Sequence, residues 1–325
     1  MELQWPLILF TALVAWSAGL FGTQALLAAG GHAKRSQTPA WVASAALLAA
    51  GGIAVFFHLE HWERIFNGFG HITSGITQEL IAIVVLAVVA VAYLVAMRRS
   101  EDGATVPKWL CWAAVAVCAV LVAVMAHSYT MAARPAWDSV LWILYVLGNA
   151  CALGPCTMAL VMAAVGDETA PAGLPALAGT ALGAVTAVAF AASLQASAGA
   201  FAEVGFYFDP THPTAGMADA AAVVAAQAPL LWAGAVAVGG LAPLAAAFVG
   251  RRSGNWKVWG GVAVACALAG AVLVGGALPL AAALMGRKTG DWRLWGTVAV
   301  VCALAGAVAL RVVFYELGLS VFMFY

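Results

Sequence analysis

Between Glu79 and Arg98 the chain reads Leu80-Ile-Ala-Ile-Val-Val-Leu-Ala-Val-Val-Ala-Val-Ala-Tyr-Leu-Val-Ala-Met97, which is 18 residues without a charge. A bilayer core about 30 Å thick is crossed by roughly 20 apolar residues in a helix. Such a segment must be helical, because hydrocarbon offers no hydrogen-bond partners to an open backbone. The sequence therefore predicts a transmembrane helix over approximately Gln78–Met97.

The composition of the whole chain agrees with a membrane protein. Of its 325 residues, 65% are apolar and 9% are charged, against roughly 45–50% and about 25% in a globular protein, which excludes a water-soluble fold. The 14 Lys and Arg balance the 14 Asp and Glu, so no basic field exists to bind nucleic acid. The 6 cysteines lie in apolar runs without a CxxC pair, so we expect no metal site and no disulfide framework.

Charges and clusters of Pro and Gly divide the chain into segments of similar length. The predicted fold is all-α: residues 1–325 form one polytopic transmembrane helix bundle. Its nine hydrophobic spans are Trp5–Ala29, Trp41–Phe57, Gln78–Met97, Trp109–His127, Val140–Val165, Leu174–Ala200, Pro229–Val249, Trp259–Met285 and Trp295–Phe314.

The positive charges predict how the bundle is oriented, because Lys and Arg favour the cytoplasmic side. Connections one, three and seven carry most of them: Lys34, Arg35, Arg98, Arg99, Lys108, Arg251, Arg252 and Lys257. Connections two and four carry only Arg64 and Arg134. We therefore expect a protein of the cell membrane whose N-terminus and second connection are extracytoplasmic.

Connection eight breaks this pattern, and an internal repeat explains why. Gly250-Arg-Arg-Ser-Gly-Asn-Trp-Lys-Val-Trp-Gly260 recurs 36 residues later as Gly286-Arg-Lys-Thr-Gly-Asp-Trp-Arg-Leu-Trp-Gly296. The repeat lies within residues 241–310 and duplicates one helix with its basic loop. Duplication of a single span carries a loop that prefers the cytoplasm to the opposite face. We infer an eight-helix ancestor with one added helix.

The richest polar cluster follows span two and ends where span three begins. It contains His58, Arg64, Phe66 and Glu79. One interpretation is a solvated interfacial turn in which Glu60 and Arg64 pair across one helical turn. The other starts from depth, because His58 ends an apolar run and Glu79 precedes one, so both can lie at the hydrocarbon boundary.

That depth suits a membrane quinol, which has an apolar tail and a ring whose two hydroxyls lose protons as two electrons leave. An imidazole such as His58 can take a proton near neutral pH. The guanidinium of Arg64 can hold the oxygen as it becomes negative, and Glu79 can pass a proton to water. Phe66 can serve as an apolar or stacking wall.

Several motifs, in this order, resemble the membrane anchor subunit of dimethyl sulfoxide reductase. They are Glu2-Leu-Gln-Trp-Pro-Leu-Ile-Leu-Phe-Thr11, Phe57-His-Leu59 with Arg64-Ile-Phe-Asn67, Gln78-Glu79, the segment from Trp142 to Pro155, and Leu310-Arg-Val-Val-Phe-Tyr315. The resemblance covers most of the chain outside the duplicated segment. One departure is Glu60-His-Trp-Glu63, which replaces a small turn containing Gly and Pro.

The resemblance implies an eight-helix, quinol-oxidising subunit that binds menaquinol and carries neither haem nor metal. It implies that His58, Arg64, Phe66 and Glu79 match the family's quinol-site positions. It also implies two partners in an oxidoreductase complex: an iron–sulfur subunit with four clusters and a molybdopterin subunit that reduces the terminal acceptor.

Two other function classes are weighed against this one. A secondary transporter also uses repeats and intramembrane charges, but its repeats normally span several helices. A haem-b cytochrome needs paired histidines well inside the bundle, whereas none of the 6 histidines lies mid-span. Among the remaining polar positions, we expect Arg311 and Glu316 to form a structural ion pair or a headgroup anchor, in preference to a contact with the quinol. We also expect an interfacial role for His127 and a packing role for Asn149, Gly154 and Pro155.

Overall fold

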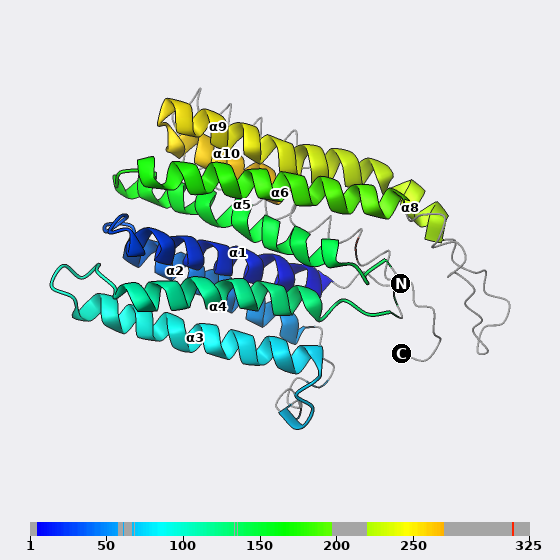
Figure 1. Ribbon diagram of the computed structural model, residues 1–325, viewed down its shortest axis with the longest axis horizontal. Helices are drawn as coiled ribbons and strands as arrows, with labels where there is room; N and C mark the ends of the chain where they lie inside the picture. Colours follow the sequence, from blue (N-terminus) through cyan, green and yellow to red (C-terminus); the bar gives the residue numbers. More distant parts are fainter. Residues whose placement is uncertain are drawn as a thin grey trace.

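The computed structural model describes residues 5–57, 61, 67, 69–132, 134, 136–196, 220–269 and 314. Over these residues the regular elements are all helices (Figure 1). They are α1 (Trp5–Ala29), α2 (Gln37–Phe56), α3 (Gly75–Arg99), α4 (Lys108–His127), α5 (Val140–Val165), α6 (Ala170–Ala196), α8 (Ala220–Pro229), the π-helical segment η2 (Leu230–Leu241), α9 (Ala242–Ser253) and α10 (Trp256–Ala269).

Seven helical stretches are long and apolar enough to cross a membrane: α1 to α6 and the continuous stretch Val224–Ser253, which joins α8, η2 and α9. Each corresponds to one of the first seven predicted spans, and α1 and α5 have the predicted bounds. The all-α helix bundle is thus confirmed. Span eight begins in α10 and continues outside the described residues. Span nine before Phe314 and the second copy of the repeat also lie outside the described residues.

Successive helices run in alternating directions, so their connections gather at two ends (Figure 1). We call one the cationic end: residues 30–36, 100–107, 166–169 and 254–255, with the helix termini beside them. All eight cations of connections one, three and seven lie there. We call the other the Glu79 end: the described residues 57, 61, 67, 69–74, 128–132, 134 and 136–139, with the helix termini beside them.

Phe314 lies at the Glu79 end, because its ring stacks on Trp142 near the start of α5. Most of spans eight and nine lies outside the described residues, and the described part of the chain contains seven helical stretches of membrane-spanning length. The prediction of nine spans is therefore not confirmed.

Helix α1 occupies the centre of the bundle and contacts α2, α4 and α5. It meets α5 at a pair of glycines: a Cβ on Gly154 would overlap the backbone of Gly19. Small residues let helix backbones approach closely inside a membrane. A hydrogen bond of 2.8 Å from the indole N–H of Trp16 to the hydroxyl of Thr157 crosses the same contact.

Helix α3 turns an apolar face outward. Val84, Val88 and Val91 are 49%, 63% and 57% exposed. Valines so exposed would cost free energy in water, whereas lipid tails solvate them as well as a protein core does. This face is therefore suited to contact lipid.

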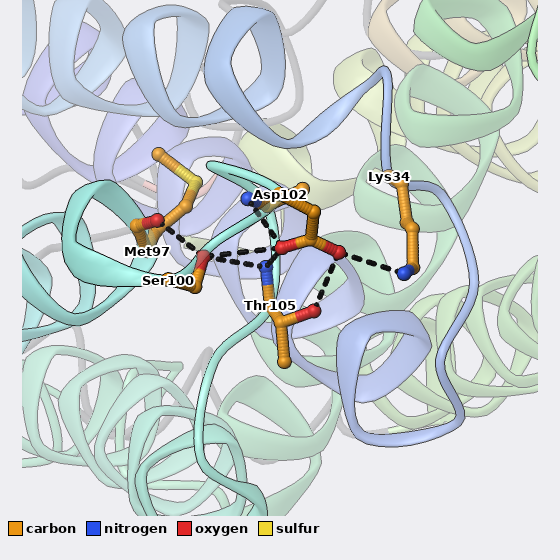
Figure 2. A network of polar contacts seen from close by, with 6 residues as sticks. Lys34, Met97, Ser100, Asp102 and Thr105 are labelled. Atoms are coloured by element: carbon orange, nitrogen blue, oxygen red, sulfur yellow. Dashed lines mark hydrogen bonds and ion pairs between the residues drawn. The ribbon is translucent and has the colours of Figure 1, made fainter.

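The loops at the cationic end are joined by side chains, as Figure 2 shows. Lys34 donates to Asp102 at 2.7 Å, linking the α1–α2 loop to the α3–α4 loop. Asp102 also accepts hydrogen bonds from Thr105, through both its hydroxyl and its backbone N–H, and from Ser100. These contacts, chiefly the one from Lys34, hold the pKa of the Asp102 carboxyl well below its usual range.

A second tie at this end joins the α1–α2 loop to the α5–α6 loop. The carboxylate of Asp167 accepts from the backbone N–H of Ser36 at 3.1 Å and from its hydroxyl at 3.0 Å. Because Ser36 immediately precedes α2, this places a negative charge at a helix N-terminus, where the helix dipole favours it.

A buried amide pair lies just inside the same end. Gln24 of α1 donates to the side chain of Gln37 in α2 at 3.0 Å, and Tyr93 of α3 donates to the same oxygen at 2.8 Å. All three side chains are almost fully buried. Helix α2 therefore begins with a buried amide at Gln37, four residues before the predicted Trp41.

Candidate functional site

Of the four predicted site residues, Glu79 is the one that the structure describes. It lies near the start of α3, where Ser74 is extended and Gly75 is the first helical residue. Its side chain is only 8% exposed, although it stands next to the apolar run that begins at Leu80. The structure therefore places a buried carboxyl at the edge of the predicted hydrocarbon layer.

The partner of Glu79 comes from α4. The hydroxyl of Ser128, which caps the C-terminal end of α4, hydrogen-bonds to the Oε1 atom of Glu79. The same hydroxyl lies 2.8 Å from the backbone carbonyl oxygen of Met125. A hydrogen bond to a buried carboxyl matters, because a buried polar group without a partner costs about 1–3 kcal/mol.

His58, Arg64 and Phe66 lie outside the described residues. Their segment connects the end of α2 to the start of α3, so both of its flanks lie at the Glu79 end. The expected grouping of these three side chains with Glu79 stays a prediction. The expected ion pair of Arg311 with Glu316 likewise lies outside the described residues.

An aromatic stack lies at the same end. The ring of Phe314 lies between those of Trp137 and Trp142, with centroid distances of 4.8 Å and 3.6 Å. The indole N–H of Trp137 donates to the backbone carbonyl of Phe314 at 2.6 Å, and the guanidinium of Arg134 lies 4.3 Å from the Trp137 ring centre. This stack attaches residue 314 to the start of α5.

The structure describes four other positions named above: His127, Asn149, Gly154 and Pro155. His127 is exposed at the Glu79 end, with its Nδ1 atom 2.9 Å from the hydroxyl of Thr130. Pro155 lies in α5 without ending it, and Gly154 faces Gly19, so packing is confirmed for these two residues. Within the described part of the chain, no three His, Cys, Asp or Glu side chains gather as a metal site would require.

Sequence reasoning missed Ser128 and the Trp137–Phe314–Trp142 stack. Ser128 could have been noticed as the first hydroxyl residue after the apolar run of α4, a position that often satisfies the last carbonyls of a helix. Its contact with Glu79 joins residues 49 positions apart, and no local pattern reports such a contact.

One comparison with known proteins gave a match. A family model described as DMSO reductase anchor subunit (DmsC) matches residues 1–205. That range contains α1 to α6 and both flanks of the polar cluster. No curated protein and no solved structure matches the chain.

Proposed function

This chain belongs to the DMSO reductase anchor subunit family, and from that premise we propose that it oxidises a membrane quinol at the Glu79 end of its bundle. As an anchor subunit of an oxidoreductase complex, it holds catalytic and electron-transfer partners at the membrane. The observation that carries the proposal is the buried carboxyl of Glu79, hydrogen-bonded to Ser128 beside an apolar helix face.

The proposed reaction releases two protons and two electrons from menaquinol. His58 takes a proton from a quinol hydroxyl, and Arg64 stabilises the oxygen as it becomes negative. Glu79 accepts a proton and passes it to water, while Phe66 forms an apolar wall for the ring. The two electrons pass to an iron–sulfur subunit with four clusters and then to a molybdopterin subunit. No haem or metal in this chain takes part.

The orientation of the bundle supports this path. By the positive-inside rule, the cations gathered at one end favour the cytoplasmic side for that end, and we infer that the Glu79 end faces outward. We place the partner subunits on that outer face. If the terminal reductase consumes its protons there, no net charge crosses the bilayer and turnover is electroneutral.

The test replaces Glu79 with Gln in the assembled complex and measures oxidation of a reduced quinol analogue. We expect a fall in rate of about 100-fold or more, because general acid–base groups contribute about 10²–10⁴-fold. Replacement of His58 should do the same. The matched control is Glu101→Gln, which changes an exposed glutamate just beyond the other end of α3 and should leave the rate unchanged.

Partner retention separates chemistry from folding in this test. The Glu79→Gln complex should co-purify with its partner subunits in the same amounts as the unmodified complex. Full quinol oxidation in both the Glu79 and the His58 variants would refute the proposed site.

A further inference from the structure

The hydroxyl of Ser128 lies between two oxygen atoms, Oε1 of Glu79 and the backbone carbonyl oxygen of Met125. A serine hydroxyl has one hydrogen to donate, and its oxygen can also accept. It cannot donate to both neighbours at once. The direction of its O–H bond must therefore depend on whether Glu79 carries a proton.

We propose that Ser128 is a positioning residue for Glu79. The hydroxyl hydrogen of Ser128 turns between Glu79 and the Met125 carbonyl as Glu79 loses and gains a proton. This rests on the proposed function of Glu79 as a proton acceptor. With Glu79 ionised, Ser128 donates to the carboxylate. With Glu79 protonated, the carboxyl O–H donates to the Ser128 oxygen, and Ser128 donates to Met125. One proton arrives on Glu79, and no covalent bond of Ser128 breaks.

Two contacts fix Ser128 in place for this role. Its backbone N–H donates to the carbonyl oxygen of Val124 at 3.0 Å, which keeps it in the last turn of α4. On α3, a Cβ at Gly75 would lie only 2.8 Å from the Cβ of Ser128. Gly75 therefore lets the end of α4 rest on the start of α3. Glu79 is four residues further on, on the same helix face.

The advantage of this arrangement is that Glu79 keeps a partner in both protonation states. A buried carboxyl that lost its hydrogen bond on gaining or losing a proton would oppose that change. Because Ser128 can accept as well as donate, proton transfer at Glu79 leaves neither group unpaired. A purely structural serine would need only the contact to Met125.

The test compares Ser128→Ala and Ser128→Thr in the complete complex. The first readout is the infrared stretching band of the protonated Glu79 carboxyl, recorded on acidification without quinol and assigned by its loss in Glu79→Gln. The second readout is kcat and KM for a reduced quinol analogue. The matched control is Thr130→Val, because the hydroxyl of Thr130 bonds within its own turn to the His127 carbonyl at 2.7 Å.

We expect Ser128→Ala to displace the carboxyl band to that of a more weakly hydrogen-bonded group. It should lower kcat by about 10- to 100-fold, the loss typical of one hydrogen bond to a charged group, with little change in KM. Ser128→Thr should restore both readouts, and Thr130→Val should change neither.

An unmoved carboxyl band in Ser128→Ala would overturn the proposal, whatever the rate. If the alanine variant does not assemble, Ser128→Cys supplies a weaker donor of similar size and should displace the band in the same direction. Failure of the unmodified complex to oxidise quinol would refute the proposed function, whereas the band readout would still decide the role of Ser128.

Discussion

The two ends of the bundle use carboxylates in opposite ways. At the cationic end, Asp102 and Asp167 bridge separate loops, and each accepts more than one hydrogen bond. Asp102 is exposed to solvent there. At the Glu79 end, the carboxyl of Glu79 is only 8% exposed, and within the described part of the chain its hydrogen-bond partner is the hydroxyl of Ser128, which follows α4.

This difference separates a structural use of charge from a chemical one. The donors around Asp102 hold it firmly in its ionised form, so it suits a permanent link between loops. A buried carboxyl whose hydroxyl partner can both donate and accept keeps a hydrogen bond when its protonation state changes. The comparison predicts that substitutions of the linking carboxylates at the cationic end lower the stability of the fold, whereas substitution of Glu79 lowers the rate of quinol oxidation.

The largest effect on stability is expected from Asp167→Ala. This change removes the acceptor of the Ser36 hydroxyl and one of the two acceptors of its backbone N–H, the other being the Ala33 carbonyl; Ser36 is fully buried. The free energy of unfolding, measured by denaturant titration in detergent, should fall by about 1–3 kcal/mol. Quinol oxidation per assembled complex should persist. Glu168→Ala, an exposed neighbour, serves as the control; an equal loss there would remove the special role of Asp167.

A smaller effect is expected at the Lys34–Asp102 link. Asp102→Ala should lower Tm more than Lys34→Ala does, because Asp102 also organises the backbone at Thr105 and Ala104. An exposed ion pair alone contributes little and is screened by salt. Thermal unfolding at low and high salt checks both statements. Equal Tm values for the two variants would mean that the ion pair alone matters.

The smallest effect concerns pH. Because the folded-state pKa of Asp102 is lowered, its contribution to stability is present above the ordinary carboxyl pKa and is lost only as pH falls through the lowered value. The difference in Tm between the unmodified protein and Asp102→Asn should stay constant from about pH 8 to about pH 5. It should shrink only under strongly acidic conditions. A difference that disappears near pH 5 would contradict the assignment.

The sequence predicts helix bounds well where apolar residues alone set them. For α1 and α5 the predicted and observed bounds agree. Helix α2 begins four residues earlier than predicted, at Gln37, whose side chain accepts hydrogen bonds from Gln24 and Tyr93 in the bundle interior. A glutamine that follows a loop is expected to be exposed, and the partners that bury Gln37 lie on two other helices, α1 and α3. Burial of this kind depends on tertiary structure and leaves no mark in local hydropathy.

The candidate site shows the same limit. The sequence located Glu79 at the edge of an apolar run, and the structure places it there with little exposure. The sequence could not supply Ser128, because the contact depends on how closely α3 and α4 approach at Gly75. The sequence also predicted correctly that eight cations lie at one end of the bundle. It could do so because their positions follow from the alternation of helix directions and not from side-chain contacts.

The central place of α1 has a consequence for biosynthesis. Among the described helices it leaves the ribosome first, yet the surface that covers its Gly19 belongs to α5, which is made more than a hundred residues later. Until then this surface of α1 must be covered by lipid, by the insertion machinery or by the helices made earlier, α2 to α4. The contact between Gly19 and α5 can therefore form only after α5 has been inserted, when the helices pack against one another within the membrane.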